Sequence, residues 1–399
     1  MSKTRKASLL AIPLVAGLLG CEPPPVEVEQ YHARGVGMEG VTNVRDIPER
    51  LAANQVPESP PPAAPGMPPV TAVYQNIQVV GHLDLGSFTR LMAGVTSWVS
   101  PDAGCTYCHV GANFADDGKY TKNVARRMLQ MTAEINSQWK EHVGDTGVTC
   151  YTCHRGMPVP ANYWHAPADP RMARGPVGGM PGQNAPNPQI GLASLPNDVF
   201  SAYLLRDDGI RLQSKQALPS GNRASIKKAE WTYGFMMHFS TALGVNCTFC
   251  HNSRAFSPWE ASTPERVRAW HGIQMVRSIN NDYMEPLSAI FPENRVGPQG
   301  DTYKINCATC HQGVNKPLLG VSMLADWPSL AAPAPGPPWN LPVDEPTSDP
   351  DPEADGGAED VEVTLESDAG AEEAAEEPSE DARRDLARSE AVEPDSVIR

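Results

Sequence analysis

Long apolar runs and an excess of basic charge are both missing from this sequence of 399 residues. No run of 18 apolar residues occurs after the N-terminus, which excludes a membrane protein with several spanning helices. Lysine and arginine number 32 against 47 aspartates and glutamates, which argues against a partner made of nucleic acid. Regular structure should be sparse because the chain holds 33 glycines and 40 prolines. A 40% apolar content still allows a sizeable core.

The negative charge is concentrated near the C-terminus. Residues 344–399 contain 21 acidic and 4 basic residues, a net charge of −17, whereas the first 343 residues carry a net charge of +2. From residue 331 onward the chain is largely proline, alanine, aspartate and glutamate, and it cannot bury enough apolar surface to offset its chain entropy. We therefore expect a disordered acidic tail over residues 331–399. We interpret it as a solubilising extension, and the alternative is an electrostatic attractant for a basic donor.

The N-terminus has the features of an export signal. Three basic residues among the first six precede an apolar stretch from Leu9 to Leu19. The ending Leu18-Leu19-Gly20-Cys21 resembles the lipobox of bacterial lipoproteins, in which cleavage leaves the cysteine as a lipid-modified N-terminus. This resemblance implies a signal peptide over residues 1–20, a lipid anchor on Cys21 and a location outside the cytoplasm. The alternative is an uncleaved membrane helix with an incidental cysteine.

Eight of the nine cysteines occur in four copies of the motif Cys-x-x-Cys-His. The copies are Cys105-Thr-Tyr-Cys108-His109, Cys150-Tyr-Thr-Cys153-His154, Cys247-Thr-Phe-Cys250-His251 and Cys307-Ala-Thr-Cys310-His311. About 0.005 copies would arise by chance from this composition, so the repetition has a chemical cause.

The motif is typical of covalently bound haem. Two thiols add to the two vinyl groups of a haem, and the adjacent histidine becomes an axial ligand of the iron. A zinc site also uses Cys-x-x-Cys pairs, but it has no need of a histidine after every second cysteine. Disulfides would leave all four histidines unexplained. We therefore predict four c-type haems, one on each motif.

The sixth ligand of each iron decides between electron transfer and catalysis. A second strong ligand makes a low-spin electron carrier, whereas an open position allows ligand binding. Met92 lies 17 residues before His109, and Met236 lies 15 residues before His251, both in apolar stretches of helical spacing. Such methionines often only pack in a core, but their recurrence before successive motifs favours ligation.

Two longer helices precede the second and fourth motifs. Apolar residues spaced by three and four predict a helix over residues 121–142, with Met128 and Met131 on its buried face. A second helix should open at Ser262, which has the spacing of a capping box with Glu265. Its apolar positions include Met275. This correspondence indicates an internal duplication with two haems in each half.

The ends of the two halves also match. The pattern His-x-Gly-x-x-x-Pro at residues 154–160 recurs at residues 311–317. We predict a mostly α-helical fold with extensive coil, packed around the haems. The predicted segments are a Pro-rich tether over 21–69, a first two-haem segment over 70–160, a Pro/Gly-rich connector over 161–225 and a second two-haem segment over 226–330.

These residues resemble the cytochrome c subunit of the purple-bacterial photosynthetic reaction centre, a tetrahaem lipoprotein on the periplasmic face of the membrane. The resemblance covers about residues 70–327, plus the anchor cysteine, and is carried by the stretches 98–105, 124–129, 147–156 and 307–317. In that family three haems have His/Met ligation and the fourth has two histidines. The resemblance therefore implies Met92, Met128 and Met236 as sixth ligands and His142 as the second histidine of the fourth haem.

Two of these assignments have open alternatives. Without the resemblance, His142 would be taken for a solvated histidine, and Met275 is the ligand that full symmetry between the halves would use. The family also places an arginine beside its highest-potential haem, and the corresponding residue is Arg266. A buried cation near the iron raises the reduction potential, because the oxidised centre carries one more positive charge. The alternative for Arg266 is a surface helix residue.

The resemblance implies a relay rather than an enzyme. A soluble periplasmic donor, such as a small cytochrome c or a high-potential iron-sulfur protein, would reduce an exposed haem, and the electrons would pass to the photo-oxidised bacteriochlorophyll pair in the core. Partners would thus be the membrane subunits of the reaction centre, the donor and the membrane itself. The alternative is a periplasmic multihaem oxidoreductase with a five-coordinate catalytic haem.

Overall fold

The structure is a computed structural model, and it describes residues 25–31, 39–167, 195–196, 198–210, 212 and 226–331. The predicted signal peptide, the anchor residue Cys21 and the acidic tail beyond residue 331 lie outside the described residues. So does most of the Pro/Gly-rich stretch between the two halves.

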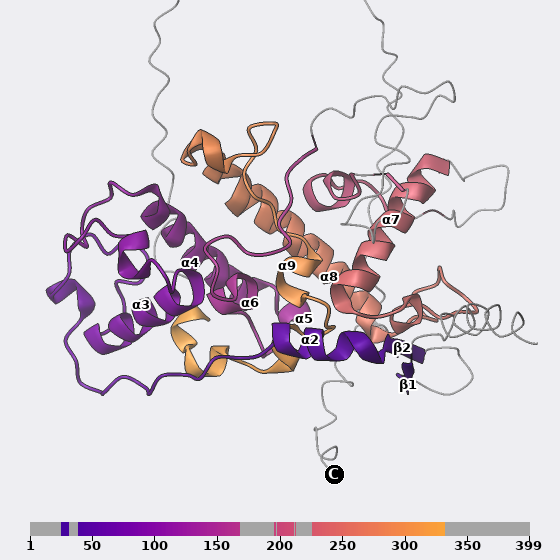
Figure 1. The fold of residues 1–399 in the computed structure, drawn as a ribbon, viewed down its shortest axis with the longest axis horizontal. Coiled ribbons are helices and arrows are strands. Elements are labelled where there is room, and N and C mark those ends of the chain that lie inside the picture. Colours follow the sequence, from indigo (N-terminus) through magenta and orange to yellow (C-terminus); the bar gives the residue numbers. More distant parts are fainter. Residues whose placement is uncertain are drawn as a thin grey trace, which may run out of the picture.

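The described chain is mostly helical, with long stretches of coil (Figure 1). A two-stranded antiparallel hairpin, β1–β2, comes first, and Val28 pairs with Val41 at its centre. The strands and α-helices are β1 Val26–Gln30, β2 Glu39–Asn43, α2 Ile47–Ala53, α3 Leu85–Val99, α4 Tyr120–Gln138, α5 Lys140–Val143, α6 Cys150–His154, α7 Ile226–Leu243, α8 Pro264–Ser278 and α9 Cys307–His311.

Short 3-10 and π-helical turns join these elements. They are η1 Val44–Asp46, η2 Val70–Ala72, η3 Gly104–Tyr107, η5 Ser201–Leu205, η6 Cys247–Phe249, η7 Ile279–Met284, η8 Glu285–Ala289, η9 Glu293–Arg295, η10 Pro317–Gly320, η11 Leu324–Asp326 and η12 Pro328–Leu330. Within the described ranges, no helix has the length and apolar character needed to cross a bilayer.

The helix predicted over residues 121–142 is interrupted, so that prediction was wrong at its C-terminal end. Helix α4 stops at Gln138, and Trp139 leaves the helical region with φ −113° and ψ 36°. The chain then forms the separate turn α5, which ends at Gly144 with a positive φ of 58°. Because of this break, His142 sits on a turn of its own that packs against α8.

The predicted capping box of the second long helix is also wrong. Thr263 is the N-cap residue of α8, and Pro264 occupies the first turn. The Thr263 hydroxyl donates to the carbonyl of Phe249 at 2.7 Å, so it is held by the third motif rather than by its own helix. The Ser262 hydroxyl, expected to cap the helix, donates to the Pro258 carbonyl at 2.8 Å.

Two apolar clusters hold the helices together. The larger one lies between α4, η5, α7, α8 and the turns that follow α8, and its members include Ile135, Phe200, Phe235 and Ile279. The smaller one joins α3 to the chain after α9. Trp98 and Trp327 meet there edge to face with ring centres 4.7 Å apart. The C-terminal described segment therefore returns to α3 and α6 in the first half, as Figure 1 shows.

The N-terminal segment, expected as an extended tether that partly wraps the globular body, contains both β strands and α2. Arg50 of α2 donates to the carbonyl of Gly244 at 3.2 Å, and in Figure 1 the chain runs on from α2 to α3. Asn54, which follows α2, is only 1% exposed. Its amide donates to the carbonyl of Gln312 at 3.2 Å, and its side-chain oxygen accepts from Leu318 N at 3.2 Å. The segment is therefore bound to the chain just after the fourth motif.

The expected connector also contributes to the core. Val199, Phe200 and Leu204 are fully buried, and Tyr203 is nearly so. These residues surround the π-helical turn η5, which packs against α8. The described part of the connector is thus a central packing element.

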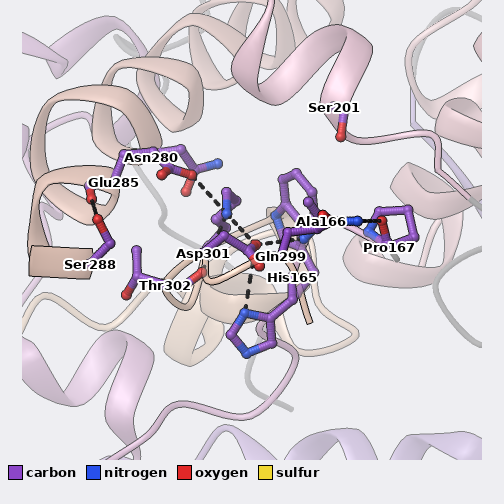
Figure 2. Close-up of polar contacts among 12 residues, drawn as sticks. His165, Ala166, Pro167, Ser201, Asn280, Glu285, Ser288, Gln299, Asp301 and Thr302 are labelled. Atoms are coloured by element: carbon purple, nitrogen blue, oxygen red, sulfur yellow. Dashed lines mark hydrogen bonds and ion pairs between the residues drawn. The ribbon is translucent and has the colours of Figure 1, made fainter. Parts of the chain in front are cut away.

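A buried ion-pair cluster fixes the start of the connector to the strand-like segment before α9 (Figure 2). Lys304, which is 1% exposed, places its Nζ 2.5 Å from Asp301 Oδ2 and 2.7 Å from Glu285 Oε1. Asp301 Oδ2 also accepts from Ala166 N at 2.7 Å. Trp164 and Lys304 pair through their backbones in both directions, so the cluster holds the approach to the fourth motif.

Candidate haem-binding site

The first and third motifs share one local geometry. Each begins in a 3-10 turn, η3 or η6, and the first cysteine of each is exposed. After each motif histidine the chain closes a small bridged turn, between Val110 and Asn113 in one case and between Asn252 and Ala255 in the other. The two motifs are therefore followed by equivalent loops.

A phenylalanine five residues after the histidine packs on its ring in both loops. His109 and Phe114 have ring centres 5.0 Å apart, and His251 and Phe256 have the same separation. The two aromatic contacts restrain the imidazole that follows the second cysteine.

The second and fourth motifs share a different geometry. Each forms a short helix, α6 or α9, and the backbone N–H before each helix donates to a threonine hydroxyl three residues on, at 3.0 Å. Each helix ends in a residue with left-handed backbone, Arg155 or Gln312, followed by a glycine. That glycine donates to the helix before the preceding motif: Gly156 N to Trp98 O, and Gly313 N to Ala242 O, both at 2.8 Å.

Three motif histidines have a fixed ring orientation. Their Nδ1 atoms lie 2.9 to 3.0 Å from backbone carbonyls, of Met157 for His154, Phe256 for His251 and Val314 for His311. Because a carbonyl only accepts, Nδ1 carries the proton and Nε2 keeps its lone pair for a metal. His109 Nδ1 is buried without a hydrogen-bond partner in the described part of the chain.

Burial keeps these imidazoles neutral. It lowers the pKa of His154 and of His251, and it lowers the pKa of His311 to about 4. A neutral ring is the form that binds iron, since a protonated ring has no free lone pair.

The cysteines suit thioether bonds rather than thiolate ligation. All eight motif cysteines are free of disulfides. Burial raises the pKa of Cys150 to about 11 and that of Cys307 to about 12, so both remain thiols at neutral pH. Among the described residues, no three His, Cys, Asp or Glu side chains converge as a protein-built metal site. The residues present fit covalently attached haem.

An apolar cavity of about 450 Å³ lies between the first and second motifs. It is lined by Cys105, Cys108 and His109 of the first motif, Cys150, Cys153 and His154 of the second, and Cys310 of the fourth. Both Met92 and Met128 line the same cavity. A continuous apolar lining between two haem-attachment motifs suits the apolar faces of a porphyrin.

The predicted methionines lie on the helices where they were expected. Met92 is on α3, Met128 on α4 and Met236 on α7, and each is partly buried against a core cluster. Met275, the alternative ligand for the fourth motif, is 5% exposed in the larger core. It lines the cavity of the first two motifs, together with Met131.

His142 lies next to the histidine of the fourth motif. The ring centres of His142 and His311 are 6.0 Å apart, with an angle of 68° between the planes. His142 Nδ1 lies 2.9 Å from the carbonyl of Arg268 in α8, the same kind of contact that the motif histidines make. Burial, and next the neighbouring His311, lower the pKa of His142 to about 4. It is therefore a partly buried, neutral imidazole rather than a solvated one.

The second and fourth motifs are in direct contact. Cys153 Sγ lies 3.0 Å from Cys310 Sγ. The guanidinium of Arg155 donates to the carbonyl of Cys310 at 3.1 Å and to Asn54 Oδ1 at 3.2 Å. Helix α7, which carries Met236, packs against α9. The four motifs consequently form one connected group.

Arg266 lies beside the third motif and is not an isolated surface residue. Its Nη1 donates to the carbonyls of Phe256, Ser257 and Pro258 at 3.1 to 3.2 Å. The Phe256 carbonyl is the same group that receives the proton of His251 Nδ1. The guanidinium also stacks over Trp259, 4.1 Å from the ring centre. Arg266 and His251 therefore share one acceptor carbonyl.

Sequence reasoning missed three residues around these motifs. Gly272 of α8 faces the His142 ring so closely that a Cβ would lie 2.5 Å from Cε1. Lys122 of α4 is 8% exposed and bonds to the loop after the first motif. Asn54 joins the N-terminal segment to the fourth motif. No local pattern marks any of them: the partners of Gly272 and Asn54 are distant in sequence, and the bond of Lys122 depends on the fold of the loop after the first motif.

Comparison with known proteins identifies the group of relatives. A family described as "Photosynthetic reaction centre cytochrome C subunit" matches residues 22–331. A photosynthetic reaction center cytochrome c subunit of Rubrivivax gelatinosus is 49% identical over 327 residues, which cover 82% of this chain and 89% of that protein. The protein of the same name from Thermochromatium tepidum is 49% identical over 333 residues, covering 83% and 82%. That from Roseobacter denitrificans is 39% identical over 316 residues, covering 76% and 85%.

These matches include the segments that hold all four motifs, and they agree with the apolar cavity and neutral histidines described above. The chain therefore belongs to the family of photosynthetic reaction centre cytochrome c subunits, electron-transfer proteins that carry covalently bound c-type haem and associate with the reaction-centre core at the photosynthetic membrane.

Proposed function

We propose that the chain carries four haems, one on each Cys-x-x-Cys-His motif, and relays electrons along them to the photo-oxidised bacteriochlorophyll pair of the core. The observation that supports this most directly is the continuity of the motifs. The first two line one cavity, and Cys153 of the second touches Cys310 of the fourth. Bound haem supplies the one-electron chemistry, while the protein supplies position and electrostatics.

The proposed axial ligands come in four pairs. They are His109 with Met92, His154 with Met128, His251 with Met236, and His311 with His142. The covalent attachment sites are Cys105, Cys108, Cys150, Cys153, Cys247, Cys250, Cys307 and Cys310. Methionine raises the reduction potential relative to a second histidine, so three haems should have higher potentials and the fourth a lower one.

The matched loops, helices and glycine contacts support an internal duplication. One half contains α3, η3, α4 and α6, and the other contains α7, η6, α8 and α9. The contacts that relate Gly156 to Trp98 and Gly313 to Ala242 have equal lengths of 2.8 Å. In this proposal, each half holds two haems.

The spatial order of the sites follows from the same contacts. The first motif neighbours the second through the cavity, the second neighbours the fourth through the two thiols, and the fourth neighbours the third through α7 and α9. The first and third motifs then form the two ends of the relay. Their first cysteines are the exposed ones, Cys105 and Cys247.

The location and remaining partners rest on the sequence. Lipidation of Cys21 would hold the protein at the periplasmic face of the inner membrane. A soluble cytochrome c or a high-potential iron-sulfur protein would deliver electrons to a haem at one end of the relay.

Haem counting tests the proposal. Pyridine haemochrome spectra and intact mass of the purified chain should give four haems, and a double Cys→Ala substitution in any one motif should remove one. Carbon monoxide should leave the reduced spectrum unchanged, because every iron has two strong ligands. A high-spin component that binds carbon monoxide would contradict the relay and support a catalytic haem.

A further inference from the structure

The equivalence of the two halves extends to a buried cation beside the first motif. Lys122 is the third residue of α4, as Arg266 is the third residue of α8. Lys122 Nζ donates to the carbonyl of Phe114 at 2.9 Å, and Arg266 donates to the carbonyl of Phe256. Each of these phenylalanines packs on the histidine of its motif. At each of the two motifs a cation thus donates to the carbonyl of the phenylalanine that contacts the motif histidine, and at the third motif His251 bonds to that carbonyl as well.

Lys122 also lies at the wall of the haem cavity. Lys122, Phe114 and His109 all line it, together with Met92. Lys122 and His109 thus line the same cavity, and both contact Phe114. A second donor bond from Nζ, to Asp116 O at 2.9 Å, holds the ammonium in place.

The local charge around the first motif is positive. Lys122 and Arg126 pair with the same carboxylate, Asp117, at 2.8 and 2.9 Å. The two cationic side chains are 10% and 8% exposed, whereas Asp117 is 40% exposed. Water screens the carboxylate more than the buried cations, so one anion does not cancel the field of both.

We propose that Lys122 is a positioning residue that raises the reduction potential of the haem on the first motif, as the counterpart of Arg266 at the third. Oxidation of the iron adds one positive charge, which a fixed buried cation opposes. The inference rests on the proposed haem at Cys105 and Cys108. It predicts that the haems at both ends of the relay have their potentials raised by a nearby cation, a lysine at one end and an arginine at the other.

A redox titration of the haem-loaded chain, followed in the α-band, tests this inference. Lys122→Gln keeps a donor for the loop carbonyls but removes the charge, and it should lower one of the midpoints. Lys122→Arg should restore it. Lys140→Gln, a change at an exposed lysine, should leave all midpoints in place. The component that moves should be the one altered by Met92→Ala.

Asp117→Asn should shift the same midpoint in the opposite direction. It removes the screened negative charge and should raise the same midpoint, whereas damage to the loop would shift both variants in one direction. Equal directions for Lys122→Gln and Asp117→Asn, or no shift in either, would overturn the inference. Failure of the underlying proposal has a separate signature, because Cys105→Ala with Cys108→Ala would then leave the haem count unchanged.

Discussion

The rings of His142 and His311 lie 6.0 Å apart, centre to centre, although 168 residues separate them in the sequence. A metal bound by two imidazole nitrogens at about 2 Å each separates the ring centres by roughly 6 Å. Both rings use Nδ1 to contact a backbone carbonyl, so both present Nε2 as the free nitrogen. The break in the helix at Trp139 is what brings His142 into this position.

Replacing His142 by methionine should raise one midpoint and leave the other three unchanged. The reason is that a thioether ligand favours ferrous haem more than an imidazole does. A spectroscopic redox titration of the haem-loaded chain measures this directly. His82→Met, at an exposed histidine, is the matched control and should change nothing. If the titration of the His142→Met variant is unaltered, the sixth ligand of that haem is Met275 or another residue.

Gly272 determines how closely His142 can approach α8. A Cβ at Gly272 would lie 2.5 Å from Cε1 and 2.8 Å from Nδ1 of the His142 ring. Gly272→Ala should therefore displace the ring and give one haem high-spin character, visible as a carbon-monoxide-binding component. Gly81→Ala is the control, since its new methyl would meet only ordinary contacts, the closest at 3.5 Å. A spectrum that stays fully low-spin in Gly272→Ala would show that the ring does not depend on this contact.

Periodicity in the sequence was enough to predict two of the long helices, α4 and α8, but not how they end. Helix α4 stops at Gln138, and the ring of the next residue, Trp139, packs against the larger core. Helix α8 starts one residue late because Thr263 bonds to Phe249 of the third motif. Both boundaries depend on tertiary partners, which no local propensity contains.

The packing role of η5 was equally hidden from the sequence. Its surroundings are rich in proline and glycine, which predicted a connector, yet Phe200 and Leu204 are fully buried. In the site, the motif residues were evident from spacing alone, whereas Gly272 and Lys122 were not. The roles of these two residues depend on contacts that exist only in the folded chain, so no sequence pattern predicts them.

Arg266→Met should lower the midpoint of the third haem. The guanidinium donates to the Phe256 carbonyl and so competes with His251 Nδ1–H for that acceptor. Its removal would strengthen the bond from His251, make the ligand more basic and stabilise ferric iron, in addition to the loss of the positive charge. The affected component should coincide with that altered by Met236→His. Arg206→Gln, at a side chain 62% exposed, is the control, and an equal shift in both variants would rule out a local effect.

Lys304→Met should destabilise the fold without moving any midpoint. The substitution removes the buried cation and leaves Asp301, whose side chain is 10% exposed, without the ammonium group that it pairs with. Breaking such a pair costs about 3 kcal/mol, which is measurable as a lower urea midpoint of unfolding. Lys316→Met, at an exposed lysine, should change the free energy of unfolding by less than about 0.5 kcal/mol. Equal stability of the two variants would mean that the cluster in Figure 2 does not support the fold.

The same cluster should make the free energy of unfolding fall at acid pH. Burial alone would raise the pKa of Asp301, but the hydrogen bonds from Lys304 and from the backbone of Ala166, together with the positive charge of Lys304, outweigh it and hold the pKa below the usual value of 3.8. A carboxyl with a lowered pKa in the folded state contributes fully above the unfolded pKa of about 3.9 and loses that contribution as pH falls through the folded pKa. Urea unfolding at about pH 6 and about pH 3 should therefore show a larger loss in the unmodified chain than in Asp301→Asn. The variant should already be less stable at the higher pH, because Lys304 then lacks one carboxylate. If both proteins lose the same free energy of unfolding on acidification, other groups cause that loss.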